Sequence, residues 1–105
     1  MIFTVDLELV ATRDGGRQGK INVGYRSSWD TGDRLDDGAV HVHDAPIIGL
    51  QDDPLSPGAR TIAQIRPVSP EYWRDVGVGD QLRMLEGRTL VGNARVLSRS
   101  DASTL

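Results

Sequence analysis

The first residues of the chain alternate between hydrophobic and polar side chains, and this pattern constrains the fold more than any other feature of the sequence. The residues on one face are Phe3, Val5, Leu7 and Leu9, and those on the other are Thr4, Asp6 and Glu8. Successive side chains of a β-strand point to opposite faces, so a repeat of two residues indicates a strand with one buried face. This segment must therefore cover a hydrophobic core.

Further extended segments follow at short intervals. We predict them at residues 21–29, 39–43, 46–50, 61–66, 81–86 and 89–98. The runs between them are rich in glycine, proline and aspartate, which are typical of turns, and they comprise residues 14–16, 30–38, 52–58, 76–80 and Gly87. We expect Val23, Tyr25 and Trp29 to share one strand face. Residues 30–38 have almost nothing to bury, so we expect a mobile surface loop there.

Only one segment carries a helical signal. Ser69 could cap a helix, and Pro70 follows it at the first helical position, which suits a single turn over residues 69–74. We expect Trp73, in this turn, to plug one end of the core. Six or seven short strands with one helical turn favour an antiparallel barrel or sandwich, and barrel closure would remove the exposed edges of so small a sheet.

The composition indicates one small domain in a reducing compartment. A chain of 105 residues can build a core without covalent cross-links, and it contains no cysteine. We expect the domain to cover residues 1–99, with a frayed tail at 100–105. The sequence shows no basic run followed by an apolar core at its start and no apolar stretch long enough for a membrane span. We therefore expect a cytoplasmic protein that does not bind membranes.

The charge is unevenly distributed. The net charge is −3, and residues 30–53 hold seven acidic side chains and one basic side chain, Arg34. Proteins that wrap nucleic acid usually present a basic face, so this acidic middle argues against strong RNA or DNA binding.

Four motifs occur in an order and at a spacing that are informative in combination. They are the Gly15-Gly16-Arg17 turn, Gly24-Tyr25-Arg26 followed by Trp29, Pro57-Gly58 before a strand ending at Pro67, and the hairpin from Glu86-Gly87 to Val91-Gly92. In this combination the chain resembles the third domain of elongation factor Tu, over residues 3–99. The resemblance implies an all-β fold, a small closed antiparallel six-stranded β-barrel, without the GTPase part of that factor.

In that family, the face that includes the Gly-Gly-Arg turn and the last hairpin helps to hold the backbone of the tRNA T-stem. The resemblance therefore implies a binding surface formed by Arg17, Gln18, Lys20, Arg26, Glu86, Gly87 and Arg88. The chain departs from the family pattern at three positions. Ser27 stands in place of a proline, Arg88 in place of a second glycine, and Thr89 in place of an arginine.

Two other motifs have ordinary explanations. Gly19-Lys20 resembles the end of a phosphate-binding loop, but Asp14 stands where that loop needs its first glycine, and Ile21 replaces the required hydroxyl residue. His41 and His43 place two imidazoles on one face of a strand and are weak candidates for zinc ligands. Two ligands do not make a site and no cysteine can complete it, so we predict no metal and no other cofactor.

No catalytic motif stands out, and we predict a binding domain that is not an enzyme. The acidic loop between Asp30 and Asp53 favours docking to a protein partner, either as an accessory to translation factors or as an antitoxin-like or immunity-like inhibitor. Arg17 and the Glu86-Gly87 hairpin favour the alternative, a weak RNA-backbone binder that keeps the family's tRNA-facing role. Both classes of partner stay open at this point.

Overall fold

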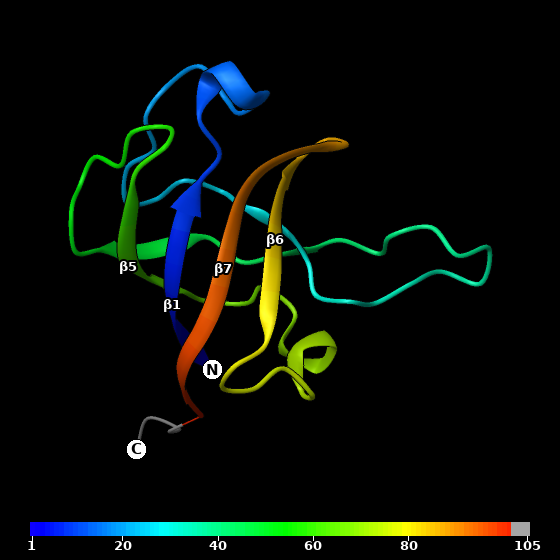
Figure 1. Cartoon of the computed structure of the whole chain (residues 1–105). Coiled ribbons are helices and arrows are strands. Elements are labelled where there is room, and N and C mark those ends of the chain that lie inside the picture. Colours follow the sequence, from blue (N-terminus) through cyan, green and yellow to red (C-terminus); the bar gives the residue numbers. More distant parts are fainter. Residues whose placement is uncertain (102–105) are drawn as a thin grey trace.

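The computed structural model describes residues 1–101, and these form one antiparallel sheet of seven strands in the order β3-β2-β6-β7-β1-β5-β4 (Figure 1). Two 3-10 turns, η1 (Thr12–Asp14) and η2 (Pro70–Trp73), are the only helical elements of this part of the chain. The strands are β1 (Ile2–Leu9), β2 (Ser28–Asp30), β3 (His43–Asp44), β4 (Ile47–Leu50), β5 (Arg60–Ile65), β6 (Gln81–Glu86) and β7 (Thr89–Ser100). The predicted all-β class is confirmed.

Strand β1 lies between β5 and β7 in the middle of the sheet. Phe3 lies opposite Ile65 of β5 on one side and opposite Arg99 of β7 on the other. The first and last strands are therefore neighbours, as the sequence predicted. Strand β7 extends to Ser100, which pairs with Ile2, so the strand reaches one residue into the predicted tail. Residues 102–105 of that tail lie outside the described residues.

The predicted closed six-stranded barrel is wrong. The sheet has seven strands and curls into an open half-barrel, in which the edge strands β3 and β4 do not pair with each other. The cause lies in residues 21–29, which we predicted as one strand. A turn interrupts them, because Gly24 adopts a φ of 96° and the Tyr25 N–H donates to the Asn22 carbonyl. Only β2 and an isolated bridge between Ile21 and Leu55 remain extended.

Local hydrogen bonds hold the open edge without forming a regular ladder. Ala45 N–H donates to the Ser27 carbonyl at 3.0 Å and Ile47 N–H to the Tyr25 carbonyl at 2.9 Å. Pro46, between these two donors, has no N–H to contribute. Val23, which we expected on the face of Tyr25 and Trp29, is instead exposed.

The core lies inside the curl of the sheet. Every hydrophobic residue of the alternating β1 pattern is buried, together with Trp29 and Trp73. Trp73 closes one end of the core as predicted, with its ring centroid 5.5 Å from that of Phe3. Ser69 stands at the N-cap as predicted, but its hydroxyl makes no cap hydrogen bond, so the predicted capping is wrong. Its carbonyl accepts from the Tyr72 N–H at 3.2 Å.

Ser27, next to β2, is fully buried. Its hydroxyl donates to the Ala45 carbonyl, and Trp29 Nε1 donates to Ser27 Oγ at 2.9 Å. A buried indole N–H needs an acceptor, and the serine helps to supply one.

The glycine-rich turn contains one position that no other residue fits. The Gly16 N–H donates to the Ala11 carbonyl at 3.0 Å, and a Cβ on Gly16 would lie 2.0 Å from the carbonyl oxygen of Val10. The neighbouring group is backbone, so it cannot rotate away.

We expect Gly16→Ala to lower the free energy of unfolding by about 2–3 kcal/mol, because the added methyl group forces the backbone apart. Gly19→Ala is the matched control. A Cβ there meets only the end of the Arg17 side chain, at 3.9 Å. The control should change stability by less than about 0.5 kcal/mol in urea unfolding. Equal effects of the two substitutions would contradict this view of the turn.

Candidate functional site

The glycine-rich turn and the last hairpin meet at what we call the junction, formed by Arg17, Tyr25 and Glu86. Arg17 Nε donates to Glu86 Oε2 at 2.9 Å, and the Tyr25 hydroxyl donates to the same oxygen. The Arg17 guanidinium also lies over the Tyr25 ring, 5.0 Å from its centroid. The structure thus brings together two segments that the resemblance placed on one face.

The junction shifts two pKa values in opposite directions. Burial, together with the hydrogen bond to Glu86, raises the pKa of Tyr25 to about 12. The hydrogen bond from Tyr25, with the adjacent Arg17, lowers the pKa of Glu86 in spite of partial burial. At neutral pH the junction therefore holds a carboxylate between a phenol and a guanidinium.

Arg17 has a structural role in this arrangement. Its Nη1 donates to the carbonyls of Gly19 and Lys20 at 2.6 and 2.8 Å, and the Thr12 hydroxyl donates to the Arg17 carbonyl. Only 20% of the Arg17 side chain is exposed. The arginine ties the turn to the hairpin. Of the other predicted binding residues, Glu86 is half-buried. The rest are exposed, and they are Gln18, Lys20, Arg26, Gly87 and Arg88.

A second cluster lies where a loop leaves the body of the protein. We call residues 31–42 the projecting loop, because they extend away from the sheet (Figure 1). The loop is folded back on itself as a hairpin. Arg34 forms an isolated bridge with Val40, the His41 N–H donates to the Asp33 carbonyl at 3.1 Å, and the Leu35 N–H donates to the Ala39 carbonyl. The sequence did not predict this organisation.

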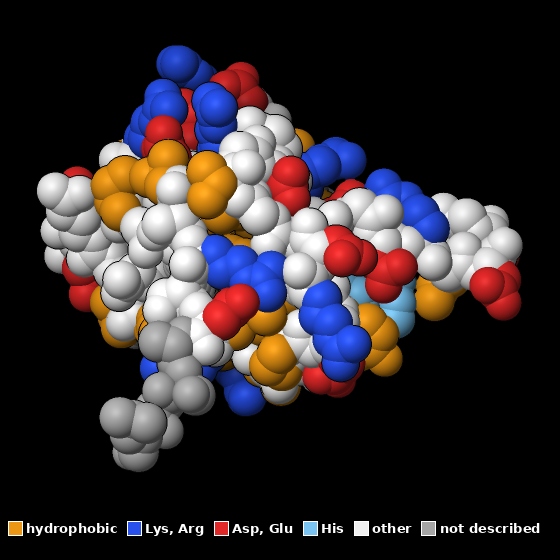
Figure 2. Space-filling view, turned by 90° about the horizontal axis from the view of Figure 1, so that it is seen from below, with side chains coloured by type: hydrophobic (Ala, Val, Ile, Leu, Met, Phe, Trp, Pro, Cys, Tyr) orange, Lys and Arg blue, Asp and Glu red, His pale blue; other side chains and the backbone are white. Residues whose placement is uncertain are grey.

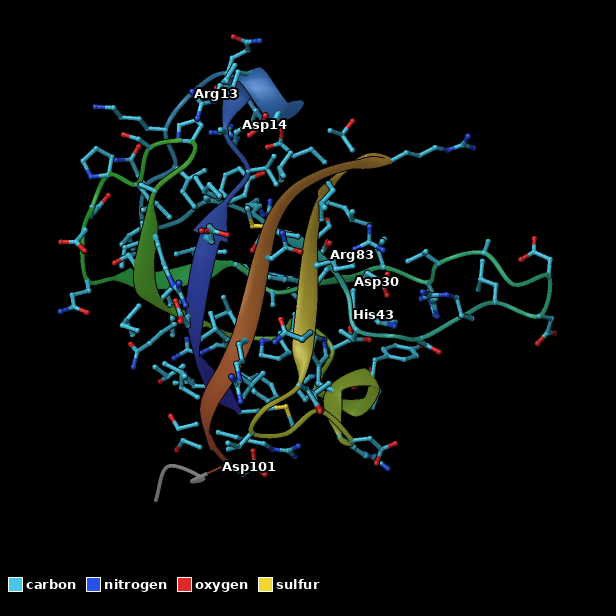
Figure 3. The ribbon with its side chains drawn as sticks, viewed as in Figure 1. Arg13, Asp14, Asp30, His43, Arg83 and Asp101 are labelled. Atoms are coloured by element: carbon cyan, nitrogen blue, oxygen red, sulfur yellow. The ribbon has the colours of Figure 1, made fainter. Side chains whose placement is uncertain are left out.

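Asp30 anchors the projecting loop to the sheet. This carboxylate is 4% exposed, accepts hydrogen bonds from Arg34 and from the Gly32 N–H, and lies 3.9 Å from Arg83 of β6. Burial alone would raise the pKa of Asp30, but the Arg34 and Gly32 hydrogen bonds outweigh it and hold the pKa below the ordinary value. Figure 3 shows Asp30, Arg83 and His43 together at the base of the loop.

The loop brings Asp33 against both histidines. Asp33 Oδ2 lies 3.0 Å from His41 Nδ1 and 2.8 Å from His43 Nε2. Tyr72 of η2 stacks on His43 with a centroid distance of 4.3 Å and meets His41 edge-on at 5.4 Å. The hydrogen bond from His43, reinforced by the Arg34 N–H and by His41, lowers the pKa of Asp33.

We call Asp33, His41 and His43 the histidine–aspartate cluster. The sequence indicates the two histidines as weak ligand candidates, but it does not predict that Asp33 of the acidic loop lies beside them. The signal that could have found it is the Asp36-Asp37-Gly38 turn, because a hairpin centred there places Asp33 beside His41.

An acidic groove opens beside this cluster. It has a volume of about 390 Å³, and Asp33 and Tyr72 form part of its wall. Its other lining residues are Thr31, Gly32, Glu71, Asp75, Val76 and Asp80. Four carboxylates thus face one groove and give it a negative potential.

Comparison with known proteins gives no family for this chain, because neither a family model nor a curated protein matches it. Among the described residues, no helix has the length and hydrophobicity that crossing a bilayer requires.

Because Glu86 is ionised at the junction, we expect the free energy of unfolding to depend on pH in the acid range. The pKa of Glu86 is lower in the folded chain than its ordinary value of 4.5, so the carboxylate stabilises the fold at neutral pH, and this contribution is lost as pH falls through the folded pKa. We expect Glu86→Gln to cost about 1 kcal/mol at pH 7 and progressively less as the pH falls below the ordinary value of 4.5. Urea unfolding at several pH values measures this difference.

Glu71→Gln is the control, since Glu71 is an exposed glutamate outside the junction. It should change the free energy of unfolding by less than about 0.5 kcal/mol. A Glu86→Gln cost that stays constant between pH 7 and pH 3 would refute the link to carboxylate ionisation.

Proposed function

We propose that this protein is a non-catalytic binding module that docks a protein partner through the projecting loop. The observation that carries the proposal is the set of exposed hydrophobic side chains on and beside this loop. They are Leu35, Val40, Val42 and Tyr72. Exposed aliphatic and aromatic side chains on a protruding element are typical of the surfaces that proteins use to bind other proteins.

The charge around these side chains favours a basic partner. Asp36 and Asp37 occupy the tip of the loop, and the acidic groove opens at its base. The one basic residue of the loop, Arg34, is paired with Asp30. Acidic and histidine side chains are visible on the loop and around its base in Figure 2. Complementary charge raises the association rate and disfavours wrong partners. The acidic side chains around the loop therefore suit a partner with a basic surface.

The junction supports an alternative, a weak RNA-backbone binder of the elongation factor Tu third-domain type. Lys20, Arg26 and Arg88 are exposed on the turn, the following segment and the hairpin. Arginine and lysine side chains contact phosphates in such complexes. The internal bonds of Arg17 and the net charge of −3 make this the weaker proposal. An antitoxin-like or immunity-like inhibitor would be one form of the protein-docking role.

The test is capture of partners from native lysate by wild-type protein and by matched variants. Val42→Asp places a charge on an exposed hydrophobic position of the loop, and Leu97→Asp does the same on β7, where the side chain has almost the same exposure, 43% against 42%. We expect Val42→Asp to weaken capture at least about fivefold, because a central interface contact contributes about 1 kcal/mol or more. Leu97→Asp should leave capture unchanged.

Nuclease treatment separates the two candidate functions. A protein-docking module keeps its partner after nuclease treatment, and Arg26→Glu has little effect on capture. Capture that disappears with nuclease and with Arg26→Glu, but survives Val42→Asp, would overturn the proposal in favour of RNA binding.

A further inference from the structure

We propose that the histidine–aspartate cluster is a binding site for a divalent transition metal ion of the zinc type. The sequence argued against a metal because two histidines do not make a site. The fold supplies the missing third ligand, since the hairpin of the projecting loop places Asp33 opposite His41. Three ligand atoms, one from each residue, lie within 4.8 Å of one another.

The spacing of these atoms suits a metal ion. Zinc binds imidazole nitrogen and carboxylate oxygen at about 2.0–2.2 Å, which places neighbouring ligand atoms of a tetrahedron about 3.3–3.5 Å apart. The two separations from Asp33 Oδ2 are 3.0 and 2.8 Å. For an ion to enter, these two separations must widen by about 0.3–0.7 Å. The two imidazole nitrogens, which lie within 4.8 Å of each other, must come to the same spacing as metal–ligand bonds replace the hydrogen bonds.

The protein holds the ligands in place before any ion arrives. His43 is 6% exposed and stacks on Tyr72 with an angle of 14° between the rings. Backbone pairing between His41 and Asp33 fixes the register of the two loop strands. Ligands that are already oriented lose little conformational entropy when they bind.

The ligand set selects the kind of metal. Two imidazoles and one carboxylate suit zinc, nickel, copper and iron(II), whereas magnesium and calcium prefer all-oxygen sites. Asp33 and His41 are both partly exposed, so an ion can enter from solvent. The acidic groove beside the site draws cations towards it. Three protein ligands leave at least one coordination position for water or another ligand.

The composition of the chain makes the proposal easy to test. Only two histidines and no cysteines occur, so an untagged chain has no other imidazole or thiolate with which to bind zinc. The experiment titrates Zn²⁺ into metal-free, untagged protein by calorimetry. We expect one ion per chain, with chemical-shift changes at the side-chain ¹⁵N of both histidines in NMR spectra.

Matched variants locate the site. His41→Ala and Asp33→Asn should each weaken zinc binding roughly tenfold or more, since each removes a direct ligand. Asp36→Asn removes an exposed carboxylate from the tip of the same loop and should leave the affinity within about twofold. Circular dichroism of each variant checks the fold. Neither His41 nor Asp33 lies in the core, so loss of binding can be separated from unfolding.

Thermal unfolding gives an independent readout. An ion that binds only the folded chain raises the melting temperature as its concentration rises, and this rise should vanish in His41→Ala. The proposal is overturned if zinc shows no saturable one-to-one binding, or if His41→Ala and Asp33→Asn bind zinc as well as the wild type does. Zinc alone is the probe, so the outcome of this test does not depend on whether the projecting loop docks a protein partner.

Discussion

Strand β1 pairs with β5 on one side and β7 on the other, and the remaining elements are arranged around this central group. Its inward face is wholly buried, and each large hydrophobic side chain on that face contributes about 2 kcal/mol by leaving water. Its ladders join residues far apart in the sequence, such as Phe3 to Ile65 and Arg99. The sheet curls over this buried face, and Trp73 closes the open end of the core.

The projecting loop carries both of the sites proposed for this protein. It is the long connection between two paired strands, since Ser28 and Trp29 of β2 lie opposite Asp44 and His43 of β3. Asp30 holds this connection through Arg34 and Arg83. A buried carboxylate is costly unless it is paired, so these contacts fix the base of the projecting loop. The candidate docking surface and the metal site both depend on that anchor.

The two clusters use polar groups differently. At the junction Arg17 and Tyr25 both donate to Oε2 of Glu86, and these two hydrogen bonds tie the turn to the hairpin. At the histidine–aspartate cluster a single carboxylate oxygen of Asp33 contacts two imidazoles, those of His41 and His43. The first arrangement ties two distant segments together, and the second is the proposed metal site, where metal–ligand bonds would replace the hydrogen bonds.

The sequence by itself determined the all-β class, the buried face of β1, the bounds of β6 and the burial of Trp73. These follow from local signals: a repeat of two residues, and glycine and proline at turns. Only the tertiary structure decided that the sheet stays open, that Arg17 turns inward to Glu86, and that His43 lies between Asp33 and Tyr72. Such contacts depend on strand register and on which distant segments become neighbours, and no local pattern encodes either.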